Sequence, residues 1–235
     1  MIYQFSEKLV AATFVKRYKR FFVDCRLEDG TEVTAHCANT GSLKSCYHEN
    51  GKVFLLPNSD PKKKLKYSWE LSIVDGHYVG INTSRPNFIF RQALEQKLIP
   101  EFSHNVEFES EVKLGEHSRI DFMLTDKDAK KTFVEIKNVT LKVENMICFP
   151  DAVTERGKKH LLELIECVKS GHKAYMFYFC NRTDGINFRI ANEIDADYYA
   201  TLKYAMQCGV MTLAYRFRPG ESGFIFDPTA LYLEL

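Results

Sequence analysis

Residues 133–141 read FVEIKNVTL. In a β-strand, successive side chains alternate between two faces, so Glu135 and Lys137 point one way while Val134 and Ile136 point the other. One face is therefore apolar and belongs to a core, and the other carries an acid and a base about 7 Å apart by strand rise. On its own this segment fits two interpretations: an exposed strand face with a weak ion pair, or part of a functional site.

A strand just upstream favours the functional site. In the segment RIDFML (119–124), Ile120, Phe122 and Leu124 alternate onto one face, which leaves Asp121 on the other. The polar stretch TDKDAKK that follows predicts a hairpin loop. A symmetric loop places Asp121 nearly opposite Glu135. Like charges that face each other across a ladder are unfavourable, so this arrangement predicts a divalent cation between the two carboxylates.

Oxygen ligands of this kind suit Mg²⁺ or Mn²⁺, which keep several waters and accept phosphate oxygens as further ligands. Lys137 lies on the same face, where it would activate a water or neutralise charge on a phosphate. The preceding strand, NVEFESEVKL (105–114), offers a third acid, since Glu109 and Glu111 share one of its faces. We therefore predict Asp121, Glu135 and Lys137 as catalytic residues, and Asp121, Glu135 and Glu111 as metal ligands.

A helix is predicted beyond the hairpin, within FPDAVTERGKKHLLELIECVKSG (149–171). Its leucine, isoleucine and valine side chains recur at helical spacing, which predicts packing on the sheet. Its first turns are polar, and Arg156 and Lys159 there suit the phosphates of DNA. Lys159 and His160 fit an ordinary solvated helix surface equally well.

Composition sets the class of protein. The chain has 235 residues, 45% hydrophobic and 27% charged, which is enough to bury a core and stay soluble. The first ten residues do not resemble a signal peptide, and no apolar run approaches the roughly 20 residues that span a bilayer. Seven cysteines without a C-x-x-C spacing disfavour both a disulfide framework and a structural zinc. We expect a cytoplasmic protein with no membrane partner.

The chain changes character near residue 83. Before it, short alternating apolar runs are separated by turn residues, which predicts a five-stranded OB-like β-barrel over residues 1–83. After it, predicted helices alternate with strands, one of which (174–180) is apolar throughout and therefore central. We predict a mixed sheet flanked by helices, an α/β domain, over residues 84–235.

Two segments of the predicted barrel mix basic with aromatic residues: VKRYKRFF (15–22) and PKKKLKYSW (61–69). A groove that neutralises phosphates and stacks bases needs this mixture. The alternative is a hairpin whose aromatic side chains face inward and whose lysines are solvated. The DNA-binding residues predicted on this face are Arg17, Tyr18, Arg20, Lys63, Lys64 and Trp69.

Several segments of this sequence resemble those of known families. A strand with Asp, a strand with Glu-x-Lys and a following helix resemble the core of the PD-(D/E)xK nuclease superfamily, which hydrolyses phosphodiester bonds using Mg²⁺; here Ile120 stands where proline is expected. A resemblance that spans almost the whole chain is to the sugar fermentation stimulation protein A family. It is carried by CANTGSL (37–43), SRIDFML (118–124), VEIKNVTL (134–141) and FPDAVTERGKKHL (149–161).

This resemblance implies an OB-like domain, a nuclease-like domain, sequence-nonspecific DNA binding and a regulatory link to sugar (maltose) metabolism in bacteria. Two functions stay open: a Mg²⁺- or Mn²⁺-dependent nuclease acting on DNA, and a DNA-binding regulator that keeps a nuclease fold without hydrolysis. A small-ligand binder that uses the loop Asn39-Thr40-Gly41-Ser42 is a third interpretation. The sequence does not fix the oligomeric state, and a homo-oligomer is compatible with it.

Overall fold

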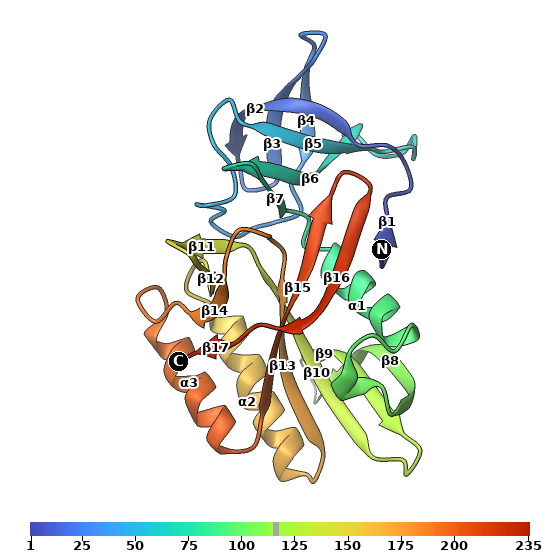
Figure 1. Cartoon of the computed structure of the whole chain (residues 1–235), viewed down its shortest axis with the longest axis vertical. Coiled ribbons are helices and arrows are strands. Elements are labelled where there is room, and N and C mark those ends of the chain that lie inside the picture. The colour runs from blue at the N-terminus through green and yellow to red at the C-terminus, as the bar shows by residue number, and fades with distance from the viewer. Residues whose placement is uncertain (115–117) are drawn as a thin grey trace.

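The computed structural model describes residues 1–114 and 118–235. A small β-barrel is stacked on a larger sheet that carries helices on both faces (Figure 1). The barrel strands are β2 (Val10–Tyr18), β3 (Phe22–Leu27), β4 (Glu32–His36), β5 (Lys52–Pro57) and β6 (Tyr67–Val74), with β7 (His77–Gly80) added beside β6. A parallel pairing of β4 with β6 closes the barrel. This is the five-stranded OB-like barrel that the sequence predicts.

The barrel interior corrects one predicted DNA contact. Trp69 is fully buried there, because the alternation of β6 points it inward. Its indole ring packs against Phe14 and Tyr47, and its Nε1 donates a hydrogen bond to the carbonyl of Leu71 at 3.0 Å. The prediction that Trp69 binds DNA is therefore wrong. The lysines of PKKKLKYSW precede the strand, whereas the tryptophan is already part of the core.

The larger sheet has seven strands in the order β1-β16-β15-β13-β10-β9-β8. Its strands are β1 (Tyr3–Gln4), β8 (Asn105–Leu114), β9 (Ser118–Asp126), β10 (Lys131–Val139), β13 (Lys173–Cys180), β15 (Met211–Gly220) and β16 (Gly223–Ala230). β8, β9 and β10 form an antiparallel meander, and β10, β13 and β15 run parallel. The predicted mixed sheet is confirmed.

Helices cover both faces of this sheet. α1 (Arg85–Glu95) and the short 3₁₀ turn η1 (Pro100–Phe102) pack on one face. α2 (Glu155–Lys169) and α3 (Ala196–Gln207) pack on the other. Because β13 lies between these two layers, almost all of its side chains are buried, which explains its apolar sequence.

A small second sheet was not predicted. It consists of β11 (Leu141–Val143), β12 (Met146–Phe149), β14 (Asn187–Ile190) and β17 (Leu233–Glu234). Strands of two to four residues are too short to show the alternation on which a prediction relies.

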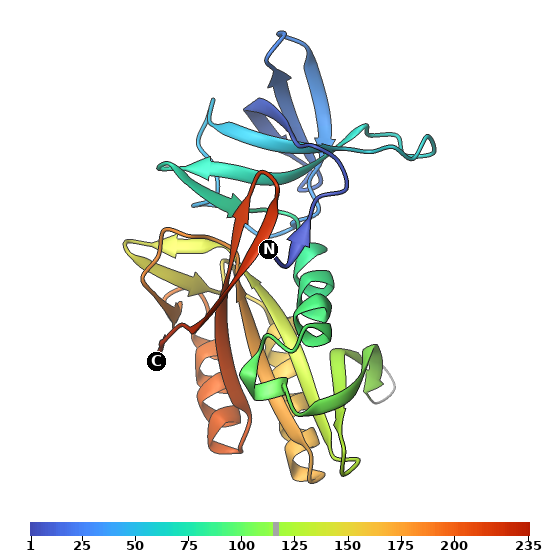
Figure 2. The ribbon, with the colours of Figure 1, turned by 45° about the vertical axis from the view of Figure 1, so that its right-hand side comes forward.

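The two parts of the molecule share a hydrophobic core. Phe54, Leu56 and Leu71 on the barrel belong to the same buried cluster as Phe179 and Phe217 of the large sheet. The N-terminal strand β1 pairs with β16 of that sheet, beside the barrel (Figure 2). The residues of β1 thus pair with the large sheet and not with the barrel. The domain boundary near residue 83 stays a prediction. Within the described ranges, no helix is both long and apolar enough to cross a membrane.

Candidate functional site

The register of β9 and β10 brings Asp121 and Glu135 together. The paired residues run from Lys131↔Thr125 to Val134↔Phe122, so the next step would set Glu135 opposite Asp121. The ladder ends at this point. The carboxylate of Asp121 accepts a hydrogen bond from the backbone N–H of Ile136 at 2.7 Å.

Asp121 is half-buried at the end of that ladder. Its second carboxylate oxygen accepts a hydrogen bond from Nδ2 of Asn87, in α1, at 2.8 Å. Burial, followed by the charge of Glu135, raises the pKa of Asp121 to about 6, although the two hydrogen bonds oppose the shift. The two carboxylates therefore repel each other in the folded chain.

Glu135 is buried, with only 3% of its surface exposed. Its Oε1 contacts Nζ of Lys137 at 2.8 Å and also Nδ1 of His160. Burial raises the pKa of Glu135, but His160 and Lys137 outweigh that effect and lower the pKa below its ordinary value. Among the described residues, Oε2 of Glu135 has no hydrogen-bond partner. A buried carboxylate oxygen without a partner is costly unless a cation or water completes it.

His160 was not predicted as a site residue, yet it is 4% exposed and belongs to the cluster. Nε of Arg156 donates to its Nε2 at 3.3 Å, so the ring proton lies on Nδ1 and donates to Glu135. The interpretation of His160 as solvated helix surface is wrong. A sequence signal existed: His160 lies one turn before Leu164, on the edge of the apolar stripe of α2.

Lys137 completes a compact polar cluster beneath α2. Its side chain is 12% exposed, and its Nζ lies 3.3 Å from Nδ1 of His160 as well as beside Glu135. Two carboxylates, one ammonium and one imidazole thus lie together at the end of β9 and β10. A cation placed between the carboxylates would relieve their repulsion.

The donor set fits a hard divalent cation. It offers the unpartnered Oε2 of Glu135 and the carboxylate of Asp121, and carboxylate oxygens are the ligands that Mg²⁺ takes alongside its own waters. No group of three or more His, Cys, Asp or Glu side chains with metal-binding geometry occurs in the part of the chain that the structure describes. Water or phosphate oxygens would therefore supply the other ligands.

Glu111, the predicted third ligand, lies on the neighbouring strand β8. It lies opposite Asp121 in the β8–β9 register, between the pairs Ser110↔Phe122 and Val112↔Ile120. However, it is exposed and its backbone has a φ of 56°, in the left-handed region. A metal-binding role for Glu111 stays a prediction.

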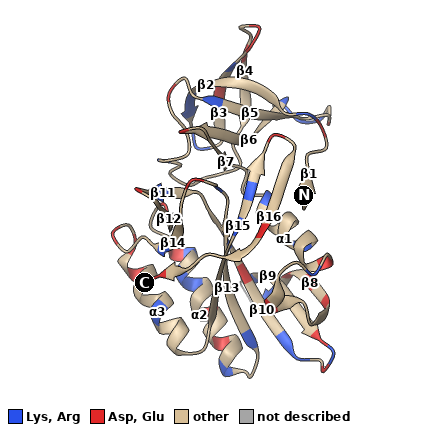
Figure 3. Ribbon diagram, viewed as in Figure 1, with Lys and Arg blue, Asp and Glu red and all other residues tan. Residues whose placement is uncertain are grey.

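The predicted DNA contacts lie on two surfaces. Tyr18, Arg20, Lys63 and Lys64 are exposed on the barrel, and Arg156 and Lys159 are exposed at the start of α2. Basic and acidic residues are interspersed over both parts of the molecule (Figure 3).

Arg17 is also on the barrel, but its donors are largely used within the protein. Its guanidinium donates to the carbonyls of Gly41 at 2.9 Å and Asn39 at 2.7 Å, and to the carbonyl of Arg20. Arg17 thus fixes the loop that Arg20 belongs to. Its own contact with DNA stays a prediction.

The loop Asn39-Thr40-Gly41-Ser42 of the barrel contacts the segment that precedes α2. The carboxylate of Asp151 accepts hydrogen bonds from the backbone N–H groups of Ser42 at 2.8 Å and Leu43 at 3.3 Å. A Cβ at Gly41 would collide with Asp151, so only glycine allows this approach. Two of the segments that carry the family resemblance, 37–43 and 149–161, are therefore in direct contact.

Comparison with known proteins gives the family. The model of the sugar fermentation stimulation protein RE domain matches residues 84–223, and that of the SfsA N-terminal OB domain matches residues 15–81. The chain belongs to the sugar fermentation stimulation protein family. A homolog from Ruegeria sp. (strain TM1040) is 48% identical over 212 residues, which are 89% of this chain and 91% of the relative.

Other relatives agree with this family. A homolog from Paramagnetospirillum magneticum is 45% identical over 220 residues, which are 94% of this chain and 93% of the relative. The solved structure of Pyrococcus furiosus SfsA in complex with Ca²⁺ has a TM-score of 0.90 at 23% identity, and covers 100% of this chain and 99% of that chain. At this identity the likeness shows the fold alone. It confirms the OB-like barrel followed by a mixed sheet flanked by helices.

Proposed function

We propose that this member of the sugar fermentation stimulation protein family binds DNA and hydrolyses its phosphodiester bonds with a divalent cation, Mg²⁺ or Mn²⁺. The observation that carries the proposal is the unpartnered, buried Oε2 of Glu135 beside the half-buried carboxylate of Asp121. The Pyrococcus furiosus protein of the same fold was solved in complex with Ca²⁺, which is consistent with a divalent cation. A cytoplasmic location belongs to the same proposal.

Asp121 and Glu135 would hold the cation, which when bound supplies Lewis acidity and shields phosphate charge. Lys137 has three N–H donors, and its hydrogen bond to Glu135 uses one of them; since Nδ1 of His160 carries its own proton, the other two are left for phosphate oxygens. His160, itself oriented by Arg156, fixes the carboxylate of Glu135. Positioning of this kind is what a hydrolytic site needs before any substrate arrives.

DNA would contact the exposed basic side chains of the barrel and of α2. Each phosphate neutralised on duplex DNA contributes about −0.9 to the slope of log affinity against log salt. Replacing Lys63 and Lys64 together with alanine should flatten that slope by about two units. An unchanged slope would place the binding surface elsewhere on the molecule.

A second function, DNA-binding regulation without hydrolysis, is favoured by a different observation. Oε1 of Glu135 is already paired with Lys137 and His160, so half of the carboxylate is satisfied without a cation. In such a protein, the cluster would serve stability alone. The link to maltose metabolism that the family resemblance implies belongs to this alternative, and the homo-oligomer stays a prediction.

A cleavage assay separates the two functions. The substrates are single-stranded, duplex and branched DNA, each with Mg²⁺, with Mn²⁺ and with chelator. We expect cation-dependent cleavage that Asp121→Ala and Glu135→Ala abolish, and that Lys137→Ala slows by about 10²-fold or more. Lys169→Ala, on the exposed face of the same helix α2, is the matched control.

The outcomes of this assay are distinct. DNA binding by the wild type without any cleavage supports the regulatory function. Undiminished cleavage by Glu135→Ala shows that the site is wrong. Glu111→Ala tests the third ligand, and because Glu111 is exposed we expect a smaller loss than for Asp121→Ala or Glu135→Ala.

A further inference from the structure

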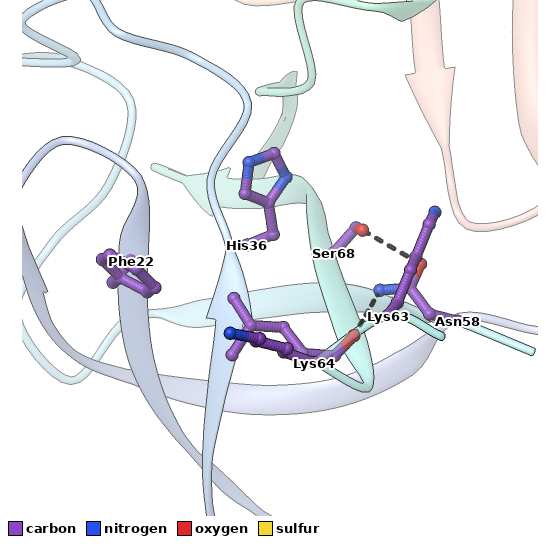
Figure 4. A pocket seen from close by; sticks show the side chains of 7 residues that line it. Phe22, His36, Asn58, Lys63, Lys64 and Ser68 are labelled. Carbon is purple, nitrogen blue, oxygen red and sulfur yellow. Dashed lines mark hydrogen bonds between the residues drawn. The ribbon is translucent and has the colours of Figure 1, made fainter. Parts of the chain in front are cut away.

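The barrel carries a hollow of about 400 Å³ on its outer surface (Figure 4). It lies where β3 begins, β4 ends and β6 begins, under the connection that joins β5 to β6. In Figure 4, the ring of Phe22 and the ring of His36 come from neighbouring strands, and Lys63 and Lys64 come from the connection. The residues that line it are Phe22, His36, Asn58, Lys63, Lys64, Leu65 and Ser68.

Strand register explains why these side chains meet. Tyr18 is paired with Phe22, Phe22 with His36, and His36 with Ser68. Residues paired directly across a ladder share one face of the sheet, so these four form a row across β2, β3, β4 and β6. The row faces outward, whereas neighbours such as Val23 and Ala35 face the barrel core.

The aromatic part of the row forms a platform. The rings of Phe22 and Tyr18 are stacked, with centroids 5.5 Å apart and planes at 17°. Tyr18 is 36% exposed, and Nζ of Lys16 lies 5.7 Å from the centre of its ring. This ammonium group also pairs with Asp24 at 3.5 Å. A flat aromatic surface bordered by an ammonium group suits the face of a nucleobase and its adjoining phosphate.

The connection that carries the lysines is held in place. Asn58 donates from Nδ2 to the carbonyl of Leu65 at 2.9 Å and accepts from Oγ of Ser68 at 3.2 Å (Figure 4). None of the residues that line the hollow within the described chain is acidic. The hollow is therefore apolar on its walls and positive at its rim.

We propose that this hollow receives one unpaired nucleobase, so that the preferred ligand of the barrel is DNA with a single-stranded segment. The proposal rests on the proposed function in that its ligand is DNA. The base would stack on Phe22 beside His36, with its phosphates on Lys63 and Lys64. β3 and β4 are the second and third strands of the barrel, the face with which OB-folds bind oligonucleotides. A paired base inside a duplex cannot enter without being unstacked.

A second hollow lies where the barrel meets the residues that precede α2. Arg20, two residues before Phe22, lines it together with Asp151 and Thr154. Thr154 caps α2, and Arg156 in the first turn of α2 contacts His160.

Fluorescence anisotropy with a labelled oligonucleotide tests the proposal. The probes are one single strand, its blunt duplex, and the same single strand with abasic sites. Phe22→Leu keeps an apolar side chain but removes the stacking ring, so single-strand affinity should fall about tenfold while duplex affinity changes less than about twofold. Tyr204→Leu, an exposed ring on α3, is the matched control.

Because Phe22 also packs on Tyr18, the exposed His36→Ala gives an independent test. It should lower single-strand affinity selectively as well, and abasic sites should abolish the difference between wild type and variant. Equal losses on single strand and duplex, or no loss in either variant, would overturn the base-binding hollow while leaving DNA binding intact. If the wild type binds none of the probes, the proposed function itself fails.

Discussion

Asp184 and Asp121 are two aspartates with opposite environments. The carboxylate of Asp184 accepts hydrogen bonds from Arg182 at 2.6 and 2.8 Å and from Lys142 at 3.0 Å. Burial alone would raise its pKa, but Arg182 and then Lys142 lower it to about 2. At Asp121, burial and then the negative charge of Glu135 raise the pKa to about 6 instead.

The cluster around Asp184 is therefore a structural ion cluster, whereas the cluster around Asp121 has the character of a binding site. Arg182 is fully buried and also donates to Ser45, before β5 on the barrel side, and to the carbonyl of Thr140. That cluster is complete, and it ties the barrel to the sheet. The cluster at Asp121 and Glu135 holds excess negative charge and an unpartnered oxygen, so a cation from outside would complete it.

The largest expected effect concerns the complete cluster. Arg182→Ala leaves Lys142 as the partner of Asp184. It also removes the N–H groups that donate to Oγ of Ser45 and to the carbonyl of Thr140. Breaking a buried pair on one side costs about 3–5 kcal/mol. We expect a decrease of that size in the free energy of unfolding in urea. Arg189→Ala, which breaks the exposed pair with Glu193, should cost less than about 1 kcal/mol. A loss for Arg182→Ala as small as that of the control would contradict this contrast.

The next effect concerns Asp121 and pH. Its folded pKa of about 6 lies above the ordinary 3.8, so its contribution to stability is fully present below pH 4 and is lost as pH rises through 6. Without divalent cation, we expect a loss of about 1–3 kcal/mol in the free energy of unfolding between pH 4 and pH 7. Asp121→Asn should flatten this part of the profile, and saturating Mg²⁺ should restore stability at pH 7. If the free energy of unfolding still falls as steeply between pH 4 and pH 7 in Asp121→Asn, the pH dependence belongs to another group.

A smaller effect of opposite sign belongs to Asp184. Its pKa is lowered to about 2, so its contribution is present above pH 4 and is lost as pH falls towards 2. Chemical denaturation between pH 5 and pH 2 should show a decline that is shallower in Asp184→Asn. Mg²⁺ should not affect this limb, because the cations of this cluster are part of the protein. A Mg²⁺ dependence there would remove the distinction between the two clusters.

Sequence reasoning predicted the part of the site that one hairpin creates. The alternation in RIDFML and FVEIKNV, with the loop between them, was enough to place Asp121 near Glu135, because both strands are long and register follows the loop. The barrel and the mixed sheet were also predictable from strands and helices of ordinary length. What the sequence could not show was contact between distant segments. Asn87 reaches Asp121 from α1, and Asp151 reaches Ser42 across the two parts.

The errors have specific physical causes. Trp69 was placed on the surface because its neighbours in sequence are lysines, but those lysines precede the strand and the pleat turns the tryptophan inward. His160 follows the charged residues at the start of α2, and composition therefore suggests one more solvated side chain, although its spacing from Leu164 places it on the buried face. Periodicity was the better guide than composition at both positions.

Isothermal titration calorimetry of Mn²⁺ at pH 8 tests the central claim most directly: the carboxylates of Asp121 and Glu135 form a divalent-cation site. At this pH Asp121 is ionised, since its pKa is about 6. We expect saturable binding to the wild type, loss of that binding in Glu135→Gln, and full retention in Asp184→Asn. Binding that is unchanged in Glu135→Gln, or absent from the wild type while the protein is folded, would contradict it.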